Sequence, residues 1–449
     1  MATMVHPASK EAMMSELDLW VVPMTSKQVV RGKYVYYQPL APLESGSVIE
    51  FVIPGTGEDY IELNRTVLEI TGKFVGPSNV DLSDTDLYAP VNNFMHSLFR
   101  QIDVTLNDHQ VARSSQTYPY KAYIEKLINF SNATKETNLT SAVWYSDTDN
   151  KFNTLADDNV GYKKRSALAK SSKVFEMADK IHLDIFNVKK ALLNNVTLKV
   201  KLIRSPPEFY TMRPDKIPAT GSATSPTDSK AITFQITKAE LKIRKIKLTD
   251  RMIAAHGICL EDANAKYPIN NVEIKQFTIM ANSQGQNIDN IFLGSIPIRI
   301  FIAMVDVDAL EGSYRLNPFE FKHNSVNFLS LYIDGVQVPS RAYQPDFDNN
   351  LYLPCFLDML EAAGIWNTGK TNGFSRSNYA HGNTIFGFDL TPMMTAATDS
   401  FHLITQGSMR LEIKFAKALT KNINLLIYGE NDHIMQADTG RRIALDFAT

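Results

Sequence analysis

Apolar and polar residues alternate along many short stretches of the chain, and two of these stretches are alike. Residues 102–111 and 329–338 each alternate up to a two-residue turn and then resume with Gln-Val. The turn is Asn107-Asp108 in the first stretch and Asp334-Gly335 in the second. Alternation with a period of two indicates a half-buried strand, and such turn pairs are typical of hairpins. The pattern therefore predicts two equivalent β-hairpins, 227 residues apart in a chain of 449.

The segments around each hairpin come in the same order in both halves. Each hairpin is followed by a short amphipathic helix with proline near its start, at 118–128 and 353–363. Strands are expected in pairs: 48–53 with 272–279, 183–185 with 388–390, 198–203 with 411–416, and 232–248 with 423–428. Further strands are expected at 61–75 and from about Phe94 onwards. A strand is also expected at 296–305, as the third repeat partner in the second half. The conserved order predicts a duplicated β-domain.

Many short strands with long turns predict a sandwich or a barrel, and eight strands in two packed sheets form a jelly roll. We therefore expect an all-β fold of two tandem eight-stranded jelly rolls, with short helices in the loops. The expected divisions are an extended arm at 1–46, jelly rolls at 47–250 and 251–431, and a tail at 432–449. The proline-rich stretch at 205–230 could be a domain linker, but the strand after it matches the last strand of the second half. We therefore place the boundary near 250, and expect surface loops at 76–88, 205–230 and 364–383.

Composition narrows the classes of function. The 46 basic and 48 acidic side chains give a net charge of -2, which argues against a nucleic acid held by a basic surface. Cys259 and Cys355 are too few for a disulfide framework or a metal cluster, and we expect both to be buried thiols in a reducing compartment. Neither a signal peptide nor an apolar run long enough to span a membrane is apparent.

One stretch matches a nucleotide-binding motif. Residues 364–371 fit G-x-x-x-x-G-K-[ST], in which Lys370 would reach phosphate oxygens and Thr371 would hold Mg²⁺. That chemistry requires a strand before the loop and a helix after it. Here a helix is expected before the loop, with Gly364 as its C-terminal cap, and a poor helix former follows. We interpret the match as a coincidence.

Other candidate residues favour structural roles. The carboxylates of Asp147 and Asp149 could bind Ca²⁺, but Phe152 stands where that loop needs glycine, so a solvated turn is expected. The basic run 163–165 could be a localisation signal or a contact to anionic inner components, but a solvated loop is expected. His182 and His402 fall in strand-like segments and are expected to be structural.

The sequence contains few motifs that are typical of catalytic or metal sites. A G-x-S-x-G elbow, which would seat a hydrolase nucleophile, does not occur. The histidines form neither His-Glu-x-x-His nor a tight cluster with cysteine. We therefore expect no catalytic, cofactor-binding or metal-binding residues, although the paired carboxylates of a glycosidase could be recognised only in a fold.

Four segments resemble a known family. Residues 88–128, 266–280, 312–347 and 409–419 are similar to the double jelly-roll major capsid proteins of Polinton (Maverick) elements and adintovirus-like DNA viruses, and the resemblance runs from about Glu16 to Tyr428. It implies a non-enzymatic protein that forms homotrimeric, pseudo-hexagonal capsomers. These would tile an icosahedral shell around double-stranded DNA, without reading its sequence. The implied partners are neighbouring capsomers, a single jelly-roll penton protein and minor capsid proteins. The implied location is the virion, after synthesis in the host cytoplasm or nucleus.

Two other readings remain open. A duplicated jelly-roll carbohydrate-binding protein would expose an aromatic cluster with Asp or Asn in one set of loops. A jelly-roll amidase or glycosidase would gather polar groups in a pocket. A capsid protein would form trimers and shells.

Overall fold

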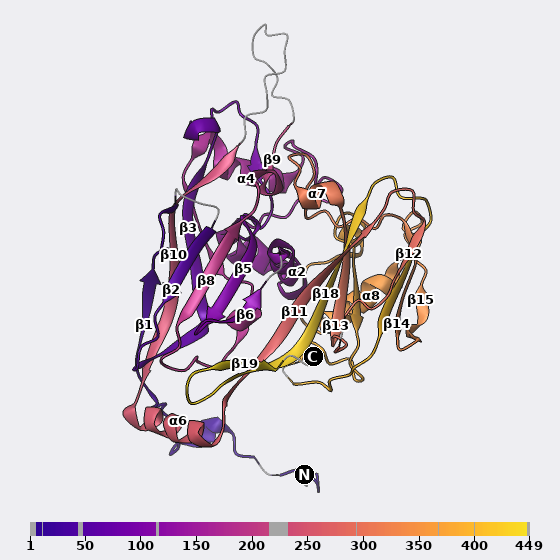
Figure 1. Cartoon of the computed structure of the whole chain (residues 1–449). Coiled ribbons are helices and arrows are strands. Elements are labelled where there is room, and N and C mark those ends of the chain that lie inside the picture. The colour runs from indigo at the N-terminus through magenta and orange to yellow at the C-terminus, as the bar shows by residue number, and fades with distance from the viewer. Residues whose placement is uncertain are drawn as a thin grey trace.

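A computed structural model describes residues 6–10, 12–43, 48–113, 116–214, 232–292, 294–366, 368–398 and 400–446. The strands form two β-sandwiches that lie side by side (Figure 1). Among the described residues, no helix is long and apolar enough to cross a membrane.

The first sandwich contains two antiparallel four-stranded sheets. One sheet has the order β1 (Val29–Tyr37), β10 (Thr233–Leu248), β3 (Asp59–Val75) and β7 (Phe175–Lys180). The other has the order β2 (Val48–Ile53), β8 (Leu198–Arg204), β5 (Phe99–Leu106) and β6 (His109–Arg113). With these eight strands numbered along the chain, the two orders are 1-8-3-6 and 2-7-4-5.

The second sandwich repeats this order. One sheet has the order β11 (Ala265–Ile279), β18 (Ile423–Ala437), β13 (Arg299–Asp306) and β16 (Ile385–Asp389), and β19 (Ile443–Asp446) adds to β18. The other has the order β12 (Gly285–Ile288), β17 (Met409–Phe415), β14 (Val326–Ile333) and β15 (Val336–Tyr343). Without β19 the orders are again 1-8-3-6 and 2-7-4-5, so two tandem eight-stranded jelly rolls are confirmed.

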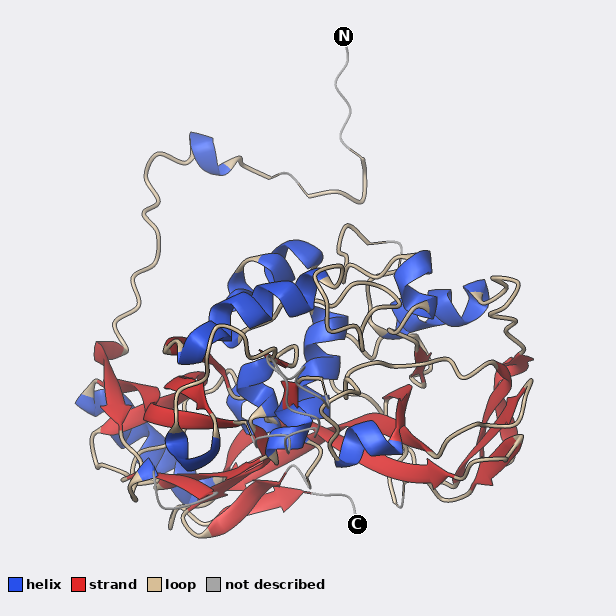
Figure 2. Cartoon of the chain, turned by 90° about the horizontal axis from the view of Figure 1, so that it is seen from above, coloured by secondary structure: helices blue, strands red, loops and turns tan. Residues whose placement is uncertain are grey.

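Short helices occupy the connections, and many of them gather on one side of the strands (Figure 2). The α-helices are α1 (Phe94–Ser97), α2 (Tyr118–Asn129), α3 (Asn132–Glu136), α4 (Val160–Ala169), α5 (Pro207–Tyr210), α6 (Asp250–Asp262), α7 (Val307–Glu311), α8 (Leu353–Ala362) and α9 (Arg376–Ala380). The 3₁₀ helices are η1 (Ser15–Leu17), η3 (Pro77–Asn79), η4 (Asn138–Ala142), η5 (Lys170–Ser172) and η6 (Asp184–Asn187). A small ladder joins β4 (Ala89–Pro90) to β9 (Thr211–Met212).

Both predicted hairpins and the helices after them are present. The turn residues Asn107 and Asp108 have φ of 45° and 67°, and Asp334 and Gly335 have φ of 48° and 81°. Positive φ at both central residues matches the turn that joins two twisted strands most directly. Helices α2 and α8 begin with proline in the first turn, as expected.

The predicted arm at 1–46 is wrong for residues 29–37. These residues form β1, which pairs antiparallel with β10 from Val29 opposite Leu248 to Tyr37 opposite Leu241. Most of β1 is exposed on both faces, so its sequence lacks the alternation that a half-buried strand shows. The predicted tail at 432–449 also needs correction, because β18 continues to Ala437 and β19 pairs with it.

Several repeat partners were also assigned wrongly. By position in the sheets, 272–279 lies in β11, the equivalent of β1, whereas the equivalent of β2 (48–53) is β12. Residues 184–187 form η6, so β7 rather than 183–185 is the equivalent of β16. The chain at Phe94 begins α1, and the next strand starts at Phe99. Alternation identifies a strand, but it does not say which position in the sheet the strand takes.

The expected loops are only partly irregular. The loop at 364–383 contains α9, and the loop at 205–230 contains α5 and β9, while its residues 215–230 lie outside the described part of the chain. Helix α6 follows β10 and precedes β11, so it lies between the two jelly rolls in the chain. The largest buried apolar cluster includes Phe301, Phe319 and Tyr428 of the second jelly roll together with the core of the first, so the two share a buried contact.

Candidate functional site

A buried ion pair stands at the junction of the two jelly rolls. Arg165, on α4, places Nη2 2.6 Å from Oδ1 of Asp147, and both side chains are fully buried. Arg165 Nε also donates a hydrogen bond to the carbonyl oxygen of Pro90 at 2.8 Å. Asp147 accepts a second bond from Asn159 Nδ2 and a third from Asn317 Nδ2, each at 2.9 Å. Because Asn317 belongs to the second jelly roll, this one carboxylate ties both halves together.

Aromatic rings fill the space beside this ion pair. Tyr123, on α2, stacks on Phe319 of the second jelly roll, with ring centroids 4.2 Å apart and planes 11° from parallel. Its other neighbour is Trp144, at 4.9 Å between centroids. Burial raises the pKa of the Tyr123 hydroxyl well above its usual value. Stacked aromatic pairs stabilise by about 0.5–1.5 kcal/mol beyond the area they bury, so these rings reinforce the junction.

Polar contacts cross the junction at two further places. Asp184 Oδ1 lies 2.6 Å from Lys121 Nζ, and its Oδ2 accepts a hydrogen bond from the backbone N–H of Val272 at 3.1 Å. Lys135 Nζ donates to the carbonyl oxygen of Asn372 at 2.7 Å, and burial lowers the pKa of Lys135 to about 7. Such contacts have defined directions, so the jelly rolls are held in one relative orientation.

A buried charged cluster lies between α2 and the first jelly roll. Lys126 Nζ is 2.5 Å from Asp179 Oδ2, and His96 Nε2 is 3.0 Å from the same oxygen. His96, Asp179 and His182 each offer a ligand atom, all within 4.8 Å of one another, a spacing that a metal ion could bridge. The Lys126 ammonium bound to Asp179 opposes a cation there. Desolvation, and then the charge of Lys126, lower the pKa of His96 to about 3. The cluster therefore works as an internal ion-pair network.

This cluster could not be predicted from the sequence, because its members come from α1, α2 and the segment around β7. His96, Lys126 and Asp179 follow one another at separations of 30 and 53 residues, and His182 comes three residues after Asp179, so the set matches no ligand motif. Only the fold brings them together.

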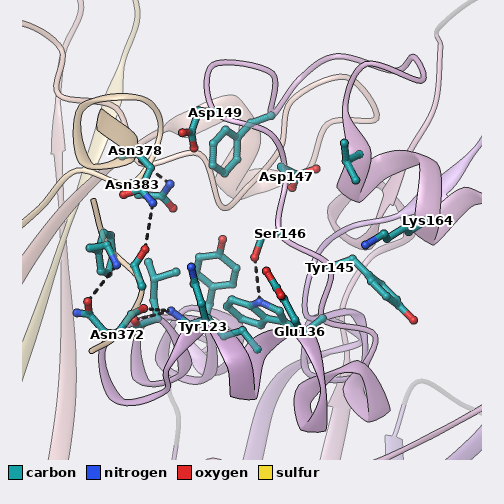
Figure 3. A pocket seen from close by; sticks show the side chains of 18 residues that line it. Tyr123, Glu136, Tyr145, Ser146, Asp147, Asp149, Lys164, Asn372, Asn378 and Asn383 are labelled. Carbon is teal, nitrogen blue, oxygen red and sulfur yellow. Dashed lines mark hydrogen bonds between the residues drawn. The ribbon is translucent and has the colours of Figure 1, made fainter. Parts of the chain in front are cut away.

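A cavity of about 460 Å³ opens between loops of the two jelly rolls, and Figure 3 shows its lining. Many of its polar groups already bind the backbone. Asn378 accepts from the N–H of Ser375 and donates to the carbonyl of Gly373, and Asn383 donates to the carbonyl of Asn378. These bonds hold the loop from 373 to 383 in shape, so the amides act first as loop supports.

The motif at 364–371 has the surroundings expected of a coincidence. Helix α8 precedes it, ending at Ala362, and Gly364 has φ of +69° directly after that helix. The next helix, α9, begins only at Arg376. Lys370 is exposed, and the motif's Asn367 lies outside the described residues. A strand–loop–helix cradle for phosphates is therefore not formed here.

Three expectations about local environment were wrong. Asp147 is buried at the junction rather than in a solvated turn. The run 163–165 belongs to α4 rather than a loop, and its Arg165 is buried while Lys163 forms an exposed pair with Asp157 at 3.0 Å. Cys259 is exposed on α6.

The other named side chains lie in structural surroundings. Cys355 is buried, and desolvation raises the pKa of its thiol to about 12. His182 Nδ1 is 2.7 Å from Glu125 Oε2, and His402 Nδ1 is 2.9 Å from Asp432 Oδ2. Both histidines therefore have carboxylate partners inside the fold, in agreement with structural roles.

Among the described residues, exposed large apolar side chains are scattered over the surface, and they are most concentrated in three segments. Clusters of exposed apolar residues on a protein surface are typical of sites that bind a partner. The residues are Met13, Met14, Leu17, Leu19, Trp20, Val21, Val22 and Met24 in the arm, Val29, Val30, Tyr34 and Tyr36 in β1, and Met393, Met394, Phe401, Leu403 and Ile404 in the loop before β17. Lys242 and Arg244, in the neighbouring strand β10, lie over the ring of Tyr34 in β1, at 5.0 and 5.2 Å from its centroid.

The flanks of the molecule end in open sheet edges. Strand β1 closes one side of the first jelly roll, and β12 and β15 close one sheet of the second; these strands lie at opposite sides of Figure 1. An edge strand presents unpaired backbone N–H and C=O groups, which favour pairing with another chain. Both outer flanks can therefore serve as contact surfaces.

Comparison with known proteins places this fold among capsid proteins. No family model matches the chain. An uncharacterised protein of Caenorhabditis elegans is 25% identical over 408 residues, which is 88% of this chain and 93% of that protein. A chain in the structure of the Sputnik virophage has a TM-score of 0.61 at 11% identity, covering 98% of this chain and 93% of its own.

Two further structures are named as major capsid proteins. That of mavirus has a TM-score of 0.52 at 10% identity, covering 100% of this chain and 96% of its own. That of Faustovirus has a TM-score of 0.50 at 7% identity, covering 93% and 92%. The chain therefore has the double jelly-roll fold of the major capsid proteins of virophages and large DNA viruses.

Proposed function

We propose that this chain is a major capsid protein that forms homotrimers, and that these pseudo-hexagonal capsomers tile an icosahedral shell around double-stranded DNA. The observation that carries the proposal is the repeated strand order of two jelly rolls, fixed together by a buried junction. A unit with two like lobes in one orientation gives six lobes when three copies close around a threefold axis. Closed head-to-tail contacts of this kind form rings.

The open flanks supply surfaces for such a ring. Each β1 flank would meet the β12 and β15 flank of the next copy, so these three edge strands would be covered. The exposed rings of Tyr34 and Tyr36, with Lys242 beside them, give the β1 flank both apolar area and charge. The net charge of -2 limits repulsion between the many copies of a shell.

The finer assignment rests on the sequence resemblance. We assign the chain to a Polinton (Maverick) element or an adintovirus-like DNA virus, on the four segments that resemble that family. Its partners are then other capsomers, a single jelly-roll penton protein and minor capsid proteins, and its place is the virion after synthesis in the host cytoplasm or nucleus. The role is structural, and the near-neutral charge supports enclosure of DNA without sequence-specific binding.

The purified protein is expected to be a trimer of about 150 kDa, three times the 50.4 kDa chain, and to form shells at high concentration or salt. The double variant Tyr34→Glu/Tyr36→Glu should be monomeric, because trimer formation would bury the two new carboxylates in the contact between β1 and the next copy. Light scattering and negative-stain microscopy measure both. As a control, Val160→Glu adds charge at an exposed apolar residue on α4 and should remain trimeric. A wild-type protein that stays monomeric and binds glycans would instead favour the carbohydrate-binding alternative.

Deleting residues 1–24 is expected to leave trimers intact but to impair shell assembly. The deletion stops before β1, which begins at Val29, so the ring contacts survive. It removes the exposed apolar side chains of the arm, which we propose bind outside their own capsomer. Sedimentation separates trimers from shells, and shells of normal yield from the deleted protein would contradict this role of the arm.

A further inference from the structure

Lys121 and Asp184 form an ion pair that is largely shielded from water. Lys121, on α2, is 4% exposed, and Asp184, the first residue of η6, is 8% exposed. The Nζ atom of the lysine lies 2.6 Å from Oδ1 of the aspartate. Burial removes the hydration of both charges, and their mutual attraction often fails to offset this loss. A step that removes both charges together is therefore favoured at this place.

The carboxyl group of Asp184 differs from the one that pairs with the other lysine of α2. Burial raises the pKa of Asp184 above its usual value, although the charge of Lys121 opposes the shift. Burial acts in the same direction on Asp179, but Lys126 and His96 together hold its pKa well below the usual value. Asp179 therefore stays a carboxylate, whereas Asp184 can take up a proton from the ammonium group of Lys121 along their hydrogen bond.

The contacts of Asp184 suit attack by the lysine nitrogen on the carboxyl carbon Cγ. Both carboxyl oxygens are bonded to Cγ, so a nitrogen within hydrogen-bond distance of one oxygen is also close to the carbon. The backbone N–H of Val272 donates to Oδ2 at 3.1 Å and would stabilise the negative charge that develops there during attack. Lys121 and Asp184 both line a cleft of about 510 Å³, through which a small leaving group can depart.

We propose that Lys121 and Asp184 condense to an amide, an isopeptide bond that joins α2 to η6 within one chain. The ammonium group gives one proton to Oδ1, and the resulting neutral amine forms the bond between Nζ and Cγ. The bond between Cγ and Oδ1 then breaks, and Oδ1 leaves as water with a second proton from Nζ. The third proton stays on the amide nitrogen, so the step needs no oxidant, reductant or other reactant.

The isopeptide bond strengthens the junction of the two jelly rolls. It closes a loop of the chain from residue 121 to residue 184, and a closed loop lowers the entropy of the unfolded chain. The amide keeps Oδ2, which still accepts the N–H of Val272 in the second jelly roll. Because the bond forms within one chain, the inference goes beyond the proposed capsid function and does not depend on it.

Mass spectrometry of the full-length protein, unfolded in acid, tests the inference. The wild-type chain is expected to be lighter than its sequence by the mass of one water molecule. A protease digest should contain the peptide of Lys121 joined to the peptide of Asp184. Lys121→Arg keeps a cation beside Asp184 but lacks the amine, so its chain should have the full mass of its sequence. A wild-type chain of full mass overturns the inference, whether or not the variant folds.

The matched control is Lys199→Arg, at a lysine whose Nζ also lies 2.6 Å from an aspartate oxygen, in a solvent-exposed pair with Asp108. This variant should lose one water as the wild type does. Cyclisation at Asp334-Gly335 would also remove one water but would persist in Lys121→Arg, so a loss in that variant contradicts the bond. Light scattering on the same samples separates the two proposals. A trimer of full-mass chains contradicts only the isopeptide bond, whereas a cross-linked monomer contradicts only the capsid function.

Discussion

Replacing Arg165 with methionine is expected to lower the free energy of unfolding by about 3–5 kcal/mol, because it leaves an uncompensated buried carboxylate. Asp147 would keep its bonds from Asn159 and Asn317 but would lose the guanidinium at 2.6 Å. The carbonyl of Pro90 would also lose the donor that Arg165 Nε supplies. Urea unfolding followed by tryptophan fluorescence measures the loss, since Trp144 lies in the same junction.

Two controls make this result specific. Lys163→Met removes a cation of the same helix whose pair with Asp157 is exposed, and exposed pairs contribute about 1 kcal/mol or less. The double variant Asp147→Asn/Arg165→Met removes both charges and should recover part of the loss. If Arg165→Met and Lys163→Met unfold at the same urea concentration, the ion pair does not stabilise the junction.

The duplicated fold could be predicted because its strongest signals are local. Asn107-Asp108 and Asp334-Gly335 prefer positive φ on their own account, and a proline near the start of each following helix marks the same position in both halves. Strand β1 gave no such signal, because an exposed edge strand needs no apolar face. The sequence therefore showed the repeat but not every partner within it.

The junction could not be predicted from the sequence. Asp147 and Arg165 are typical of solvated segments by type, and contacts distant in the chain bury them, with Pro90 and with Asn317 of the second jelly roll. Lys126, on an amphipathic helix, is also charged, and its side chain is fully buried beside Asp179 of the first jelly roll. The spacing of apolar and polar residues predicts which side chains of one helix or strand face inward. Burial between two domains depends instead on contacts between residues far apart in the chain. Asp147 and Arg165, which help to hold the two halves together, were for this reason expected in solvent.

Acidification is expected to destabilise the first jelly roll through His96. Its pKa in the folded protein is about 3, lowered by desolvation first and by the charge of Lys126 second. An unfolded histidine titrates near 6.5, so between pH 6.5 and 3 the unfolded chain holds one proton more than the folded chain. Stability contributed by the neutral ring is thus fully present above 6.5 and is lost as the pH falls. Each pH unit in this interval lowers the free energy of unfolding by about 1.4 kcal/mol, and the whole interval lowers it by about 5 kcal/mol.

Asp179 adds to the loss at the acid end of this range. Although burial would raise the pKa of Asp179, Lys126 and His96 together hold it well below the usual value of 3.8. The contribution of Asp179 to the free energy of unfolding is therefore lost as the pH falls below that value.

The measurement for His96 is urea unfolding at intervals from pH 7 to pH 4. In His96→Gln the slope of the free energy of unfolding against pH should decrease by the amount that corresponds to about one proton, since glutamine does not titrate. His109→Gln, a change at an exposed histidine in β6, should leave the slope as it is. Equal slopes for the wild type and His96→Gln would show that His96 is not the group through which acid acts.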